Sequence, residues 1–425
     1  MMPKVLLIIF LLGISLSCSK ISQKDQNCDE KAVQPYVLPD LLTMQNGEKI
    51  KSIADWETKR RPEVLELYKR EIYGRVPEGF DGKLSSKIFE QSNEALDGAA
   101  IRRQIALTYS INGKELNINV LLYLPKQIKY PPLFLGYNFY GNQTIIDDTK
   151  IVLTNSWIQN NGEIGITTNC ATEQLRGKRN NRWPIKNLIS EGFGIATVNY
   201  ADIDPDRYDF SDGIHPLLYH KNQTRPAKDE WGSISAWAWG YSRILDYLKT
   251  DELTKDSKFI LFGHSRIGKA ALWAGVLDDR FDMVIANNSG CAGAAIFRRK
   301  FGERISKIYY NFPQWFCQNF KKYRKDENLL PIDQHMLIAL IAPRPVYIAS
   351  AEKDCFSDPI GEYLSGYYAT PVYEMYGKKG LNDSIQPALN TPIFNTIGYH
   401  IRSGRHGVKD YDWEQFIKFS KKHLE

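Results

Sequence analysis

The fold is decided by one stretch in the middle of the chain, which reads KFILFGHSRIGKAALW from Lys258 to Trp273. An apolar strand pattern runs into a glycine, then a serine, then a helix rich in alanine and leucine. A tight turn of this kind lifts a serine hydroxyl above a sheet, at a helix N-terminus whose backbone N–H groups can stabilise an oxyanion. The usual motif is Gly-x-Ser-x-Gly; here the second glycine comes one position late, with Ile267 in its place. The stretch predicts a nucleophile elbow at Ser265, with a plain strand-to-helix turn capped by a serine as the alternative.

Strand-like runs recur on both sides of this elbow, with helical patterns between them. They cover residues 118–124, 132–137, 194–200, 258–262, 283–287, 345–350 and 398–402. Between two of them, apolar residues from Ile234 to Leu248 follow the spacing of a buried amphipathic helix. Alternating strands and helices predict an α/β fold with a mainly parallel sheet covered on both faces. No linker or repeat interrupts residues 36–425, so we expect one domain, in which the first hundred residues decorate the sheet.

A nucleophilic serine needs a base, and the base needs an acid that orients it. In chains built around such an elbow, the acid and then the histidine follow the serine. His406 lies in a glycine-flanked loop between the last strand and the last helix, where a base can project. The loop after strand 345–350 offers Asp354 and Asp358, whereas the preceding strand end offers no carboxylate. Asp358 precedes a proline and can simply start a turn, so we predict Asp354 as the acid.

The composition excludes several classes of protein. Of the 425 residues, 43% are apolar and 24% charged, which is ordinary globular usage and excludes disorder and coiled coil as the main theme. The net charge of +6 is spread without a basic stripe, so we expect no nucleic-acid partner. Apart from Cys18, the cysteines show no zinc-type spacing, and their disulfide pairing is left open: Cys28, Cys170, Cys291, Cys317 and Cys355.

The N-terminus has the pattern of an export signal. The letters MMPK precede an apolar run at residues 5–12, which is too short to span a membrane securely. Cys18 then follows where a bacterial lipoprotein signal places its lipidated cysteine. We therefore predict a lipoprotein signal at 1–18 and a flexible polar tether at 19–35. A soluble export signal is the alternative.

Several of these stretches resemble the glucuronoyl esterases, the fifteenth family of carbohydrate esterases, and particularly their bacterial branch. The resemblance rests first on GHSRIGK at 263–269, because Ser-Arg-x-Gly-Lys after an elbow glycine is far more specific than a bare Gly-x-Ser-x-Gly. It extends to WAWGYSR at 237–243, SGCAGAA at 289–295, IAPRPVYIASA at 341–351, NFYGN at 138–142 and RWP at 182–184. It spans about Asn138 to His406 and implies an α/β-hydrolase fold.

The resemblance also implies roles for individual residues. Ser265 would be the nucleophile and His406 the base, while Arg266 would direct its guanidinium at the oxyanion. Lys269 and Glu303 would contact hydroxyls of the uronate ring. A solvated helix face is the alternative for Arg266 and Lys269. The chemistry implied needs no metal and no organic cofactor.

The chain departs from the family pattern at two positions. Asn288 stands where many members have a glutamate before Ser-Gly, so the acid role falls to Asp354, as in relatives that place it after the later strand. Phe356 stands where a tryptophan is often found two residues past that aspartate. Stacking on a sugar survives this change, but the indole N–H is lost.

The implied substrate is an ester between (4-O-methyl-)glucuronic acid on xylan and a lignin alcohol, cleaved through an acyl-enzyme. An acetyl or feruloyl xylan esterase on the same fold is one alternative; Arg266 and Lys269 favour a sugar acid instead. A non-catalytic glycan-binding surface lipoprotein is another, which the ordered serine, aspartate and histidine argue against. We expect an exported monomer, in the periplasm or at the outer membrane, that touches the membrane only through its lipid.

Overall fold

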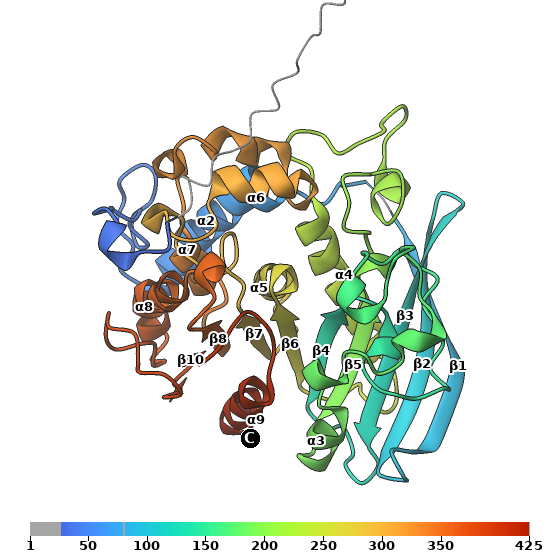
Figure 1. Cartoon of the computed structure of the whole chain (residues 1–425). Helices are drawn as coiled ribbons and strands as arrows, with labels where there is room; N and C mark the ends of the chain where they lie inside the picture. The colour runs from blue at the N-terminus through green and yellow to red at the C-terminus, as the bar shows by residue number, and fades with distance from the viewer. Residues whose placement is uncertain (1–26, 80, 425) are drawn as a thin grey trace, which may run out of the picture.

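The computed structural model describes residues 27–79 and 81–424 (Figure 1). Within them, one ten-stranded sheet has the order β1-β2-β3-β5-β4-β6-β7-β8-β10-β9. Strands β5, β4, β6, β7, β8 and β10 run parallel, while β1, β2, β3 and β9 pair antiparallel with their neighbours. The strands are β1 (Lys83–Ala95), β2 (Ala100–Ile111), β3 (Lys114–Pro125), β4 (Leu133–Asn138), β5 (Gly194–Asn199), β6 (Phe259–His264), β7 (Met283–Asn287), β8 (Val346–Ala351), β9 (Ile393–Phe394) and β10 (Ile397–Arg402).

The parallel strands match their predictions because most of their residues are apolar. Every residue of β4, β5, β6, β7, β8 and β10 is buried, as expected for strands covered on both faces. The prediction that the first hundred residues decorate the sheet is wrong from Lys83 onward. There β1 and β2 form a long hairpin that extends the sheet itself, and β1 is exposed along most of its length.

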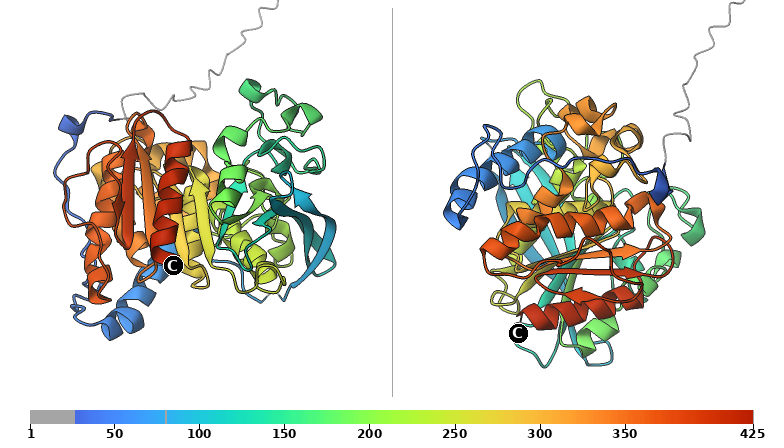
Figure 2. Two further views of the ribbon diagram at one scale, coloured as in Figure 1. Left: turned by 90° about the horizontal axis from the view of Figure 1, so that it is seen from below. Right: turned by 90° about the vertical axis from the view of Figure 1, so that its left-hand side faces the viewer.

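Helices cover both faces of the sheet, which confirms the predicted α/β architecture (Figure 1). On one face of the sheet, α4 packs on α5, α5 packs on β6 and β7, and α8 packs on β8 and β10. On the other face, α3 and α9 pack against the strands, and α9 runs beside β8 and β10 (Figure 2). The α-helices of the described residues are α1 (Ile53–Asp55), α2 (Arg61–Tyr68), α3 (Ile185–Ser190), α4 (Ser233–Leu248), α5 (Arg266–Leu277), α6 (Ile305–Asn311), α7 (Gln334–Ala339), α8 (Pro359–Met375) and α9 (Asp410–Leu424).

The predicted signal, Cys18 and the first part of the predicted tether lie outside the described residues. The last part of that tether, residues 27–35, is described and is attached to the folded body. It contains a short 3-10 turn, η2 (Glu30–Ala32), and a disulfide joins Cys28 to Cys355. Residues 27–35 therefore belong to the folded body, which extends beyond the predicted boundary at residue 36. Among the described residues, none of the helices has the length and apolar character needed to cross a bilayer.

Candidate active site

The predicted elbow is present between β6 and α5. Ser265 has φ 58° and ψ −131°, a strained conformation for a residue with a side chain. A Cβ on Gly263 would lie 2.2 Å from the carbonyl oxygen of Ile267, so this turn requires glycine there. The late glycine has a packing reason as well, because a Cβ on Gly268 would lie 3.0 Å from the Cβ of Ser289. Ile267 is fully buried and does not have a positive φ, so its position does not require glycine. The close contact with Ser289 instead places the second glycine of the motif at position 268.

The predicted acid and base are in direct contact. His406 Nδ1 lies 2.6 Å from Asp354 Oδ2, and the same oxygen accepts hydrogen bonds from Ser357 Oγ at 2.6 Å and Asn288 Nδ2 at 3.1 Å. Burial alone would raise the pKa of the Asp354 carboxyl, but the hydrogen bonds from His406 and Ser357 outweigh it and hold this pKa below its usual range. The acid is therefore a carboxylate at neutral pH, with its charge directed at His406.

The loop that carries His406 is held from inside by Arg402. The Arg402 guanidinium donates to the carbonyls of Ser403, Arg405 and Gly407 at 3.0, 3.2 and 2.7 Å. Its Nε is paired with the buried Asp412 at 2.8 Å. Three of the carbonyls in a five-residue loop are thus fixed by one rigid cation, which leaves His406 projecting at the C-terminal edge of the sheet.

Arg266 follows the serine and is held by Asp206. Its Nε lies 2.8 Å from Asp206 Oδ2, and its guanidinium carbon lies 4.8 Å from the centre of the Phe139 ring. Asp206 also accepts a hydrogen bond from Trp315 Nε1 at 2.6 Å. Burial opposes the charged guanidinium, but Tyr200 and Asp206 outweigh it and raise the pKa of Arg266 above its usual range. Because a guanidinium carries five N–H donors, this geometry leaves donors for an oxyanion.

The predicted sugar-binding residues lie around the same point. Lys269 is 4% exposed and donates to the Ser289 carbonyl; burial lowers the pKa of its ammonium, and Glu303 opposes that shift. Burial has the opposite effect on the Glu303 carboxyl: it raises the pKa of that group, and the nearby Lys269 ammonium reduces the increase. Phe356 is 48% exposed, and Lys307 Nζ lies 4.7 Å from its ring centre. The pocket therefore combines a cation and a carboxyl in its depth with an open aromatic ring.

A further carboxyl supports this wall of the pocket from behind. Glu362 is fully buried and accepts hydrogen bonds from Ser350 Oγ at 2.7 Å, Gly290 N at 2.9 Å and Ser289 Oγ at 3.2 Å. Burial raises the pKa of Glu362 to about 8. Glu362 thus holds the loop that contains Ser289, and the Ser289 carbonyl accepts a hydrogen bond from the Lys269 ammonium.

The predicted site residues line one cavity of about 270 Å³. All seven residues predicted for catalysis, oxyanion binding and substrate binding belong to it. The lining consists of Ser265, Arg266, Lys269, Asn288, Ser289, Gly290, Glu303, Phe312, Trp315, Asp354, Phe356, Ser357 and His406.

Comparison with known proteins places the chain in a family. A family model described as "Glucuronyl esterase, fungi" matches residues 187–377. Carbohydrate esterase MZ0003, from an unknown prokaryotic organism, is 45% identical over 399 residues, 94% of this chain and 92% of that protein. The structure of a promiscuous CE15 esterase from a marine bacterial metagenome has a TM-score of 0.88 at 45% identity, over 94% of this chain and 100% of that chain. Glucuronoyl esterase from Solibacter usitatus has a TM-score of 0.87 at 40% identity, over 93% of this chain and 100% of that chain. The chain belongs to carbohydrate esterase family 15.

Membership of CE15 confirms the predicted family and the α/β-hydrolase fold. Within this CE15 chain the structure brings together all seven residues predicted for catalysis, oxyanion binding and substrate binding, whereas Asp358 lies apart from the base. Asp358 is paired with Arg299 at 2.9 Å and accepts from Gly361 N, which is the turn-starting role considered for it. The catalytic roles themselves stay predictions.

Sequence reasoning missed the residues that support the site. Asp206 follows the end of β5, at the edge of the sheet where the parallel strands also deliver Ser265 and Asp354, so its position was a usable signal. Trp315 and Glu362 lie in stretches with no motif, and only the three-dimensional structure shows that they face the pocket and its wall.

Proposed function

We propose that this CE15 chain is a serine esterase that hydrolyses the ester between (4-O-methyl-)glucuronic acid of xylan and lignin alcohols. One observation carries the proposal: an elbow serine, a histidine–carboxylate pair and two cationic side chains line a single cavity. A sugar acid on the acyl side of the ester suits this site, because the acid released is an anion and Arg266 and Lys269 face it.

The reaction proceeds in two halves. Ser265 Oγ attacks the uronate carbonyl carbon while His406 takes the hydroxyl proton, and Asp354 stabilises the resulting imidazolium. Arg266 and the backbone N–H groups at the start of α5 bind the oxyanion of the tetrahedral intermediate. The intermediate collapses, His406 gives its proton to the departing alcohol, and an acyl-enzyme remains. Water, deprotonated by His406, attacks the acyl carbonyl and releases glucuronate and free Ser265.

Selectivity for the sugar acid is expected to come from the deep wall of the pocket. Lys269 and Glu303 lie where they can hydrogen-bond ring hydroxyls, and the exposed ring of Phe356 offers a face on which a sugar can stack. An acetyl esterase has no need of either contact, since an acetyl group carries no hydroxyls. The alternative of an acetyl xylan esterase therefore predicts that Lys269 is dispensable.

A substrate panel tests the proposal. Turnover of benzyl, methyl and allyl glucuronate is compared with turnover of aryl acetates and acetylated xylan, for the wild type and for Lys269→Met. A hydrogen bond from a charged group contributes about 1.5–3 kcal/mol, so Lys269→Met should lower kcat/KM for the glucuronate esters by about tenfold to a hundredfold. The same variant should leave aryl acetate turnover within about threefold of wild type. Equal losses on both substrate classes would instead favour a general esterase.

We further propose that the protein is an exported lipoprotein that acts as a monomer in the periplasm or at the outer membrane. The export-type run before Cys18 supports this address, and so does the Cys28–Cys355 disulfide, because disulfides persist mainly in oxidising compartments. Cys18→Ala should move the protein from the membrane fraction to the soluble periplasmic fraction. Unchanged partitioning would point to a soluble export signal or to another anchor.

A further inference from the structure

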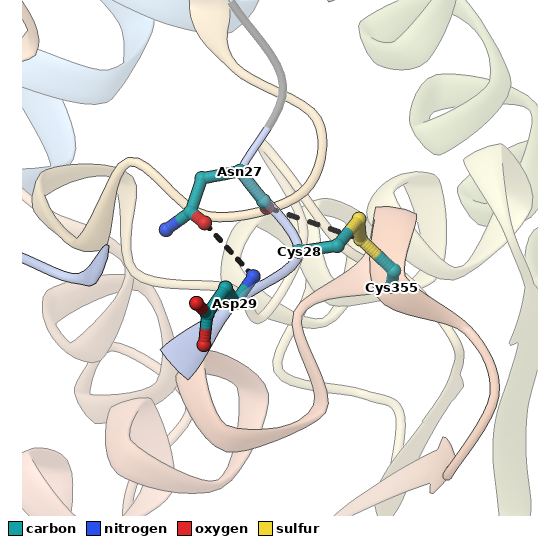
Figure 3. The surroundings of a disulfide bond; sticks show 4 residues. All are labelled: Asn27, Cys28, Asp29 and Cys355. Carbon is teal, nitrogen blue, oxygen red and sulfur yellow. Dashed lines mark hydrogen bonds between the residues drawn. A yellow bond between two sulfur atoms is a disulfide. The ribbon is translucent and has the colours of Figure 1, made fainter. Parts of the chain in front are cut away.

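The N-terminal segment (residues 27–32) is covalently joined to the loop that carries the predicted acid. The Cys28–Cys355 disulfide has a Cα–Cα distance of 5.7 Å and connects positions 327 residues apart in the chain (Figure 3). Cys355 directly follows Asp354 in the acid loop (residues 352–358), between β8 and α8. The predicted acid, which contacts His406, is thus next to a cross-link to the N-terminal segment.

The same segment also binds a second loop of the pocket. Gly302 N donates to the Asn27 carbonyl at 2.7 Å, and Arg299 Nη2 lies 2.8 Å from both carboxylate oxygens of Glu30. The Nε of Arg299 is paired in turn with Asp358 of the acid loop at 2.9 Å. Residues 27–32 therefore hold the 299–303 loop and the acid loop together from outside.

The two loops pack directly against each other. Glu303 N donates to the Phe356 carbonyl at 3.2 Å, and a Cβ on Gly302 would lie 2.1 Å from the Cys355 carbonyl oxygen. Between them the loops carry four pocket residues, Glu303, Asp354, Phe356 and Ser357. A displacement of the acid loop would therefore shift the acid and the sugar-binding wall at once.

We propose that the N-terminal segment is a positioning element of the active site, and that the Cys28–Cys355 disulfide is the link through which it holds Asp354 against His406. The inference rests on the proposed role of Asp354 as the acid. Hydrogen-bond geometry at 2.6 Å is sensitive, since a misplacement of about 1 Å can cost about a hundredfold in rate. Turnover consequently depends on this disulfide being oxidised.

Reduction of the bond is a simple exchange with a dithiol. The thiolate of dithiothreitol attacks one sulfur of the disulfide, the second thiol of the reagent closes its own ring, and two cysteine thiols are released. Cys28 is exposed, so the reagent can reach it. Reduction breaks the covalent link and leaves the non-covalent contacts as the remaining restraint on the two loops.

The test measures kcat and KM on benzyl glucuronate before and after reduction, with the new thiols counted by alkylation and mass. We expect kcat to fall about tenfold and KM to rise a few-fold. The double variant Cys28→Ser/Cys355→Ser should match reduced wild type and ignore the reductant. Cys170→Ser, which removes an exposed free thiol outside both loops, should respond to the reductant as wild type does.

Asp354→Asn separates positioning from general loosening of the fold. If the disulfide acts through Asp354, reduction should change the residual kcat of Asp354→Asn by less than about twofold. A tenfold loss in that background, or reduced wild type that keeps its kcat within twofold, would overturn the inference. Full activity of Asp354→Asn would instead refute the proposed acid. Near-UV circular dichroism shows whether reduced wild type stays folded. If the double variant does not fold, the kcat of reduced wild type alone tests the inference.

Discussion

Replacing Asp354 by asparagine removes the charge that faces His406 across 2.6 Å. When Ser265 gives up its proton, two unit charges face each other with centres about 4 Å apart. At an effective dielectric constant of about 20 this attraction is about 4 kcal/mol. His406 is 42% exposed, so solvent screening lowers the value to about 3 kcal/mol, which is about a hundredfold in rate.

The tautomer adds a second loss. A carboxylate accepts the Nδ1–H of His406 and leaves Nε2 free to take the serine proton, whereas an asparagine amide can donate to Nδ1 and hold the wrong tautomer. The equivalent change in other serine triads costs about 10⁴ in kcat. We therefore expect Asp354→Asn to lower kcat on benzyl glucuronate by about 10³–10⁴, with the melting temperature within a few degrees of wild type.

The matched control is the other aspartate of the acid loop. Asp358 contacts Arg299 and caps α8, so Asp358→Asn should reduce stability while lowering kcat far less than Asp354→Asn does. Asn288 supplies a rescue, because its Nδ2 lies 3.1 Å from the carboxylate it would replace. Asn288→Glu in the Asp354→Asn background should restore part of the rate. Full activity of Asp354→Asn with loss in Asp358→Asn would mean that the wrong aspartate has been chosen; full activity in both would refute the triad.

Three further predictions concern the nucleophile, the oxyanion side and the pocket wall. Ser265→Ala should lower turnover by about a thousandfold or more, and near-normal turnover would exclude this serine. Asp206→Asn removes the charge that orients Arg266, so kcat should fall about tenfold to a hundredfold with little change in KM; a rise in KM alone would mean that Arg266 serves binding. Glu362 keeps its proton up to about pH 8 when folded but loses it near 4.5 when unfolded, so the native state binds more protons between these values and stability falls as pH rises. The melting temperature of Glu362→Gln should therefore gain on wild type from pH 5 to about pH 8 and level off above it, and a difference that is constant over this range would contradict the buried neutral carboxyl.

The parallel core could be predicted from the sequence because each strand carries its own signal. A short run of apolar residues such as those of β6 and β7 has few ways to be buried other than as a central strand. The hairpin of β1 and β2 has no such signal: β1 is largely exposed and polar, and its place follows from pairing with β2 and then β3. Cross-strand pairing of this kind is a property of the assembled sheet, which local pattern reading does not reach.

The positions of the candidate catalytic residues could be predicted for a related reason. Ser265, Asp354 and His406 each follow a strand that is itself easy to recognise, and the ends of parallel strands meet at one edge of a sheet. Their supporting contacts join positions that no local pattern relates. Asp206 meets Arg266 across 60 positions, and Cys28 meets Cys355 across 327, so the sequence left the disulfide pairing open.

The position of the acid and the N-terminal disulfide have a common physical explanation. Strands β7 and β8 are parallel neighbours, so a carboxylate at position 288 or 354 can approach the same histidine. Asn288 directly follows β7, whereas Asp354 is three residues beyond the end of β8, and each ordered loop residue costs about 1–2 kcal/mol of backbone entropy. An acid on a loop therefore needs an external restraint that an acid at a strand end does not, and the disulfide at the next residue supplies it. It follows that the rescued enzyme, with its carboxylate moved to position 288, should lose less activity on reduction than wild type; an equal loss would show that the disulfide supports the fold at large and not the acid.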